Sequence, residues 1–124
     1  MKLYETVFIV DPQIGDDGIE RCVKKFFDYV EERASEVVRK RKWGLRKLAY
    51  QIRKRDQGYY VLINYVADGD LVRDLERELK LDESILRYMT VVVPKREMEK
   101  LRADEASEAG PRAAGGPRSQ EESG

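Results

Sequence analysis

Large apolar side chains recur at alternate positions through much of the stretch from residue 36 to residue 67, and this period restricts the fold more than any other feature. Leu48, Tyr50 and Ile52 fall on the same side of an extended chain, and the alternation returns in residues 58–67. A period of two is typical of a strand with one buried face. Two such segments in succession predict a long β-hairpin, whose first strand runs to Ile52 and whose second begins at residue 58.

Two local features are expected inside this hairpin. Gly44 interrupts the first strand. Because glycine adopts a positive φ at little cost, it predicts a β-bulge or a close backbone approach there. Asp56-Gln57-Gly58 has the composition of a turn, so we expect the chain to reverse at residues 56–58.

The segments on either side of the hairpin predict two more strands and two helices. Residues 2–10 form an apolar strand that ends before a proline, and residues 86–93 form another. Apolar side chains at three- and four-residue spacing predict helices at 17–34 and from about residue 68 to residue 79. The order βαββαβ is the split-βαβ, ferredoxin-like arrangement of the α+β class. We therefore predict a four-stranded antiparallel sheet with two helices on one face.

Composition divides the chain into a domain, residues 1–102, and a C-terminal tail, residues 103–124. The tail contains no Val, Ile, Leu, Met or aromatic residue. Such a segment cannot bury enough apolar surface to offset the entropy of ordering it, so we expect it to be disordered. Residues 95–102 are expected to continue as a frayed helical turn. The tail holds five acidic and two basic residues, which leaves the domain with a net charge of +3 although the whole chain is neutral.

The hairpin contains a long run of basic residues. Between positions 39 and 55 there are nine basic side chains and no acidic one. Cations clustered on a rigid strand are typical of a surface that binds nucleic acid. Lysine and arginine on an edge strand also prevent it from pairing with another sheet. Charge alone supports these two interpretations equally.

Several classes of function lack the residues they would need. The chain has no histidine and one cysteine, Cys22, so neither an internal disulfide nor a metal site is expected. It also lacks a nucleophile motif and a glycine-rich phosphate loop, so we expect no cofactor and no enzymatic activity. No apolar run approaches the roughly 18 to 20 residues of a membrane span. We expect a soluble, cytoplasmic protein that does not bind a membrane.

Four collinear stretches have a distinctive sequence. They are Leu3-Tyr4-Glu5-Thr6-Val7-Phe8-Ile9-Val10-Asp11-Pro12, Trp43-Gly44-Leu45-Arg46-Lys47-Leu48-Ala49-Tyr50-x-Ile52, Gln57-Gly58-Tyr59-Tyr60, and Asp74-Leu75-x-Arg77-Glu78-Leu79 with Arg87-x-Met89. Over about residues 2–93 the chain resembles the family of bacterial small-subunit ribosomal protein six, although Gln51 replaces a usual proline and Lys2 a common arginine. The resemblance implies a structural constituent of the small subunit. It further implies cooperative binding of the central domain of small-subunit (16S) ribosomal RNA, as a heterodimer with ribosomal protein eighteen, during assembly.

Two sets of candidate site residues follow. Cations on strands and turns fit the phosphate spacing of folded RNA without reading its sequence. Matched to the family, the RNA contacts fall on Lys2, Arg46, Lys47, Lys54 and Arg87. Tyr4 and Tyr50 are their aromatic neighbours, although the spacing also predicts Tyr50 as a core aromatic with a polar tip. Because two helices cover only one face of the sheet, its other apolar face predicts a protein-partner surface. The residues of that surface are Val7, Ile9, Tyr60, Leu62, Met89 and Val91.

Other functions on the same fold stay open. Residues 57–61 have the glycine and aromatics of an RNA-recognition motif but lack its leading cation and small residue. Aliphatic side chains beside Tyr60 would also make the face more apolar than base stacking needs. This weakens the interpretation as a free-standing RNA-recognition-type domain. A protein-interaction or small-ligand regulatory domain is the remaining alternative. A ligand domain would need convergent polar groups in a pocket, for which Gly69 at a helix start is the lone candidate.

Overall fold

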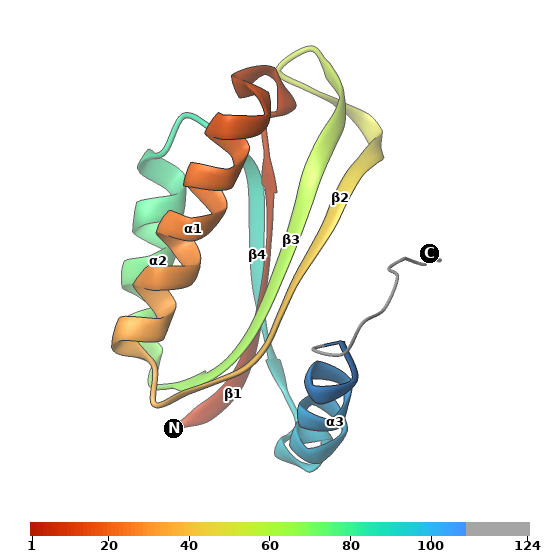
Figure 1. Cartoon of the computed structure of the whole chain (residues 1–124). Coiled ribbons are helices and arrows are strands. Elements are labelled where there is room, and N and C mark those ends of the chain that lie inside the picture. Colours follow the sequence, from red (N-terminus) through yellow and green to blue (C-terminus); the bar gives the residue numbers. More distant parts are fainter. Residues whose placement is uncertain (109–124) are drawn as a thin grey trace.

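The computed structural model describes residues 1–108, which form a four-stranded sheet with helices on both sides (Figure 1). Short 3-10 turns, Pro12–Ile14 and Lys95–Glu97, precede the first and last helices. The elements, in chain order, are β1 Lys2–Val10, α1 Gly15–Arg33, β2 Glu36–Ile52, β3 Arg55–Ala67, α2 Gly69–Leu81, β4 Ile85–Val93 and α3 Met98–Glu108.

The strands are arranged in the order β2-β3-β1-β4, and every neighbouring pair is antiparallel. β1 is central and pairs with β3 along its whole length, from Lys2↔Ala67 to Val10↔Tyr59. β2 and β4 are the edge strands. α1 and α2 lie side by side on one face of the sheet, which we call the helix face (Figure 1). The predicted ferredoxin-like fold is therefore confirmed.

The main core lies between the sheet and these two helices. Alternate residues of β1, including Phe8 and Val10, meet the apolar stripes of α1 and α2. The ring of Phe8 packs at a tilt on that of Phe26, with centroids 5.4 Å apart. The buried hydroxyl of Tyr65 lies 2.8 Å from the Thr6 hydroxyl, so its polar tip keeps a hydrogen bond inside the core. This packing makes the sheet a rigid support for whatever its other face presents.

The β-bulge predicted at Gly44 is present. The register passes from Lys42↔Val61 directly to Gly44↔Tyr60, which leaves Trp43 without a partner in β3. Gly44 has φ 84°, in the left-handed region that favours glycine. The bulge divides β2 into two arms, and the charged side chains of these arms have different surroundings.

The turn predicted at residues 56–58 is wrong. The chain reverses at residues 53–54, and β3 begins at Arg55. Gly58 lies within β3 instead, where an added Cβ would be 2.1 Å from Cγ2 of Ile9. The glycine is needed because the Ile9 side chain of β1 packs directly on the β3 backbone, a tertiary requirement that resembles turn chemistry in the sequence.

The structure also differs from the disorder predicted for residues 103–124, since residues 103–108 complete α3. This helix lies on the opposite side of the sheet from α1 and α2, which we call the open face (Figure 1). Met98 and Leu101 pack on a small buried cluster of Leu3, Val38 and Val66. The prediction considered only the apolar content of the segment, whereas its acidic residues bind arginines of β2. Residues 109–124 lie outside the described part of the chain.

Candidate RNA and protein interface

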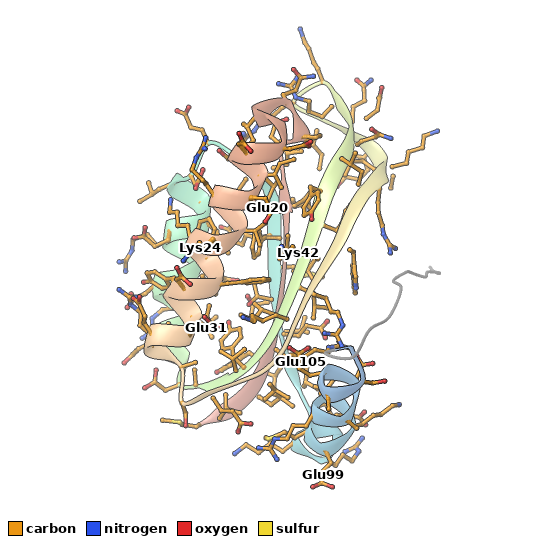
Figure 2. The ribbon with its side chains drawn as sticks, viewed as in Figure 1. Glu20, Lys24, Glu31, Lys42, Glu99 and Glu105 are labelled. Carbon is orange, nitrogen blue, oxygen red and sulfur yellow. The ribbon has the colours of Figure 1, made fainter. Side chains whose placement is uncertain are left out.

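The lysines of β2 before the bulge are paired with acidic residues of α1. The ammonium group of Lys42 lies 3.1 Å from a carboxylate oxygen of Glu20 (Figure 2). Lys40 binds Glu31, which lies nearer the C-terminal end of α1. These pairs line a groove of about 600 Å³ between α1 and β2. Lys40 and Lys42 therefore join the edge strand to the helix.

The arginines of the same arm are paired on the open face. Arg39 and Arg41 hold the Asp104 carboxylate at 2.7 and 3.0 Å, and Arg41 also binds Glu105. The Arg41 side chain is only 13% exposed. Burial raises the pKa of Asp104, but the hydrogen bond from Arg39 and the positive charges of Arg41 and Arg39 outweigh it, so this pKa lies below its usual value. These arginines attach α3 to the sheet.

The basic residues beyond the bulge have different surroundings. Arg46 is half-buried, with its guanidinium 5.3 Å from the Trp43 ring centroid, whereas Lys47 and Lys54 are exposed. Within residues 1–108, no salt bridge involves any of the five predicted RNA-contact residues. These are Lys2, Arg46, Lys47, Lys54 and Arg87.

The structure brings four of these five residues toward one end of the sheet. Arg46 and Lys47 lie opposite residues 57–58 in the hairpin, and Lys54 lies at its tip. Arg87 of β4 lies opposite Ile9, near the end of β1 that faces the hairpin tip. Lys2 begins β1, roughly 20–25 Å away along the strand at ~3.3 Å per residue, so it belongs to a separate surface.

Tyr50 and Tyr4 have opposite environments. Tyr50 is 60% exposed and accepts a hydrogen bond from Arg87, whose guanidinium lies 5.7 Å from the tyrosine ring centroid. The prediction of Tyr50 as a core aromatic is wrong, because Tyr50 lines the hollow on the open face with Leu48 and Ile52, where α1 and α2 do not cover it. Tyr4 is buried against Tyr65, with centroids 5.9 Å apart, so it is a core residue.

The open face contains an apolar hollow of about 240 Å³ near the hairpin. Leu48, Ile52 and Met89 contribute to its lining, with Tyr50 and Arg87 also present. The hollow places an apolar depression directly beside a cation–aromatic pair. Such a combination suits a protein partner whose apolar side chain enters the depression.

The six residues predicted for the partner surface differ in exposure. Met89 is 62% exposed and Val91 is exposed as well, whereas Val7 and Tyr60 are half-buried. Ile9 and Leu62 are buried, although Ile9 still lines the hollow. Ile9 packs under side chains of the hairpin, and Leu62 lies between Val7 and Arg41 of the neighbouring strands. Leu62 therefore supports the surface from within the sheet, whereas Ile9 contributes to the lining of the hollow.

Sequence reasoning missed three contributors near the hairpin. Leu48 and Ile52 line the hollow. They occupy the same side of the alternating segment, and this signal could have assigned them to the partner surface. Arg53 donates hydrogen bonds to the backbone carbonyl oxygens of Glu83 and Ile85, at 2.7 and 2.9 Å. No sequence signal separates Arg53 from the other cations of the run.

Other kinds of site find no support in the part of the chain that the structure covers. Among residues 1–108, no three His, Cys, Asp or Glu side chains are grouped so that they could hold a metal ion. No helix in the same range has both the length and the apolar character needed to cross a membrane.

Comparison with known proteins gives a consistent result. A family model described as Ribosomal protein S6 matches residues 3–92. The small ribosomal subunit protein bS6 of Christiangramia forsetii is 44% identical over 95 residues, which cover 77% of this chain and 85% of that protein. The bS6 protein of Thermosynechococcus vestitus is 35% identical over 108 residues, which cover 87% and 91% of the two chains.

A solved structure agrees with these sequences. The crystal structure of 30S ribosomal protein S6 from Thermotoga maritima superposes with a TM-score of 0.72 at 28% sequence identity. The match covers 83% of the present chain and 97% of that one.

Proposed function

The chain belongs to the ribosomal protein S6 family, and from this membership we propose that it binds the central domain of small-subunit (16S) ribosomal RNA cooperatively with ribosomal protein eighteen. As a member of the family it is a structural constituent of the small ribosomal subunit in the cytoplasm, and not an enzyme. The proposal concerns how it joins the subunit. The observation that carries it is the apolar hollow on the open face, which Arg87 helps to line, at the end of the sheet where hairpin cations without a salt bridge in residues 1–108 also lie.

The charge distribution supports RNA contact at the hairpin end of the sheet. Arg46, Lys47 and Lys54 form no salt bridge within the described residues, so their charge is available to phosphates. Positive charge on a rigid hairpin holds folded RNA in register without reading its sequence. A domain of modest net charge should bind weakly through these contacts alone.

The open face supports a protein partner. Met89 and Val91 are exposed on the side of β4 that α1 and α2 leave uncovered, and the hollow lies beside them. A free-standing RNA-recognition-type platform has less support, because Tyr60 is half-buried in an aliphatic surrounding. A basic partner seated here would add its own phosphate contacts. The protein and RNA binding steps would then be reciprocally coupled by ~1–3 kcal/mol, or about 5- to 150-fold in affinity.

Titration of the RNA central domain with this protein, in the presence and absence of ribosomal protein eighteen, tests the coupling. We expect tighter RNA binding when the partner is present. Met89→Asp should reduce the gain, because it places a charge beside the hollow. Val92→Asp is the matched control, since it introduces the same charge at another exposed position of β4, beside Tyr4 and away from the hollow. Equal RNA affinity with and without the partner would refute the proposal.

A salt series tests the RNA contacts. Each neutralised phosphate contact contributes ~0.7–0.9 to the slope of log affinity against log salt, so Arg46→Ala with Lys47→Ala should flatten that slope by roughly one to two. Lys40→Ala is the matched control, because Lys40 is already paired with Glu31 and should leave the slope unchanged. If the double variant retains the wild-type slope and affinity, the cations protect the edge strand and do not bind RNA.

A further inference from the structure

The turn between β2 and β3 has an unusual backbone. Arg53 has φ 51° and Lys54 has φ 64°, and within the described residues they are the two non-glycine residues with positive φ. A two-residue turn with positive φ at both positions is a type I′ turn, which normally contains asparagine and glycine. Arginine and lysine adopt this conformation at a conformational cost, which persists only where surrounding structure enforces it.

Two arginine contacts hold this turn in place. The guanidinium of Arg53 donates hydrogen bonds from Nη1 to the Glu83 carbonyl oxygen and from Nη2 to the Ile85 carbonyl oxygen, at the start of β4. Arg55 binds the carboxylate of Asp11 at 2.9 Å, just beyond the end of β1. These contacts therefore connect the hairpin to β1 and to β4, the next two strands in the sheet.

These contacts act at the tip of the hairpin, beyond the apolar packing of Leu48 and Ile52 on Ile9 and Leu86 and beyond the hydrogen bond from Arg87 to Tyr50. The last β1–β3 pair is Val10↔Tyr59, so the part of the hairpin from residue 46 to residue 58 extends past the end of β1. A two-stranded ribbon on its own is marginally stable. Arg53 joins this ribbon to β4 two residues before Arg87, and thereby fixes the hairpin cations relative to Arg87.

We propose that Arg53 is a positioning residue of the RNA-binding surface, which clamps the hairpin tip to the backbone of β4 and is not itself a phosphate ligand. This inference rests on the proposed RNA-binding function. Two terminal nitrogens of Arg53 are engaged by carbonyl oxygens, whereas no hydrogen bond or salt bridge within residues 1–108 holds the ammonium group of Lys54. The basic turn thus combines two roles, an internal clamp and an external charge. Without the clamp, the tip of the hairpin would have to be ordered each time RNA binds.

Arg53→Gly and Lys54→Gly form a matched pair of variants. Each replaces one cation of the turn with a residue that suits positive φ, so neither variant strains the turn. Only Arg53→Gly removes the clamp. Amide hydrogen exchange across residues 48–58 should accelerate in Arg53→Gly and remain near wild type in Lys54→Gly. Unchanged exchange in Arg53→Gly would overturn the clamp.

RNA titrations in a salt series, with the full chain and its partner protein, separate the two roles. Arg53→Gly should lose affinity by about 5- to 30-fold, the cost of ordering the backbone of roughly one residue, with the salt slope unchanged because the bound complex keeps its phosphate contacts. Lys54→Gly should lower the slope by ~0.7–0.9. Arg53→Lys keeps the charge but lacks the two Nη donors of the guanidinium, so its RNA affinity should fall as it does in Arg53→Gly.

The opposite results are equally distinct. An equal fall in slope for Arg53→Gly and Lys54→Gly, or wild-type affinity in Arg53→Lys, would make Arg53 a charge contact and overturn the positioning role. Faster exchange in Arg53→Gly with wild-type affinity would also overturn that role, since the clamp would then be purely structural. If the wild-type protein binds RNA without any salt dependence, the proposed function itself fails, whatever the exchange data show.

Discussion

Removal of the charge on Asp104 should loosen α3 from the sheet. This carboxylate accepts hydrogen bonds from Arg39 and Arg41 at 2.7 and 3.0 Å, and both arginine side chains are mostly buried. The apolar contribution of α3 is limited to Met98 and Leu101, which are half-buried. We therefore expect the attachment of α3 to depend chiefly on charge, and Asp104→Asn is the isosteric change that tests it.

The size of the effect follows from the burial of the pair. Hydrogen bonds to charged groups contribute about 1.5–3 kcal/mol each when buried, and exposed pairs contribute far less. Because the Asp104 side chain is 43% exposed, the gain is partly screened, and we expect Asp104→Asn to lower the local free energy of unfolding of α3 by about 1–2 kcal/mol. The amides of α3 would then exchange about 5- to 30-fold faster under native conditions.

Native-state hydrogen exchange, followed by NMR, measures this directly. Glu36→Gln is the matched control, because Glu36 binds Arg102 of the same helix at 2.7 and 2.9 Å but in an exposed position. This control should accelerate α3 exchange much less than Asp104→Asn does. Equal acceleration by the two variants, or no acceleration by Asp104→Asn, would refute the reasoning from burial.

The same pair gives a pH dependence with a definite sign. Because the pKa of Asp104 is lower in the folded state than its usual 3.8, its stabilising contribution is complete well above that value and is lost as the pH falls through the folded pKa. α3 should therefore loosen in acid, and less so in Asp104→Asn. A carboxyl NMR titration that places this pKa above 3.8 would contradict the ion-pair geometry.

Three further outcomes are expected. Gly58→Ala should destabilise the fold by about 1–3 kcal/mol in urea unfolding, because its Cβ would lie 2.1 Å from Cγ2 of Ile9. Burial raises the pKa of Asp82, but the hydrogen bonds from Lys25 and Ser84 and the charge of Lys25 together lower it by more, so Asp82→Asn should reduce stability at neutral pH and flatten the loss of stability below about pH 4. Burial raises the pKa of the Cys22 thiol to about 12, so a thiol reagent at pH 8 should modify the native protein only as fast as it unfolds.

The fold was predictable because its main signals are local. Alternation at 36–67 and helical spacing on either side determine the element order, and Gly44 marks its bulge through the backbone freedom of glycine. The turn was misplaced because Arg53 and Lys54 lack turn chemistry, and their left-handed conformation depends on contacts with β4. Gly58 was misinterpreted for the converse reason, since its role depends on the Ile9 side chain.

The candidate site was only partly predictable, because pairing between distant residues decides which charges are available. The sequence places Arg39 and Arg41 in the same basic run as Arg46 and Lys47. Their carboxylate partners on α3 are more than 60 residues away in the chain. Charge density along the sequence therefore overstates the basic surface, and the tertiary fold determines how much of it remains.

The two interpretations of the basic run apply to different arms of β2. Before Gly44, the cations of this edge strand are neutralised by α1 and α3, and the backbone N–H of Lys40 is itself bonded to Glu105, so acidic side chains partly cover the edge. Beyond Gly44, the described residues provide no carboxylate partner for Arg46 or Lys47. Because unpaired cations also protect an edge strand from pairing, the salt series on Arg46→Ala with Lys47→Ala decides between protection and RNA contact for this arm. We propose RNA contact for the second arm of β2, whereas the paired cations of the first arm contribute to the stability of the domain.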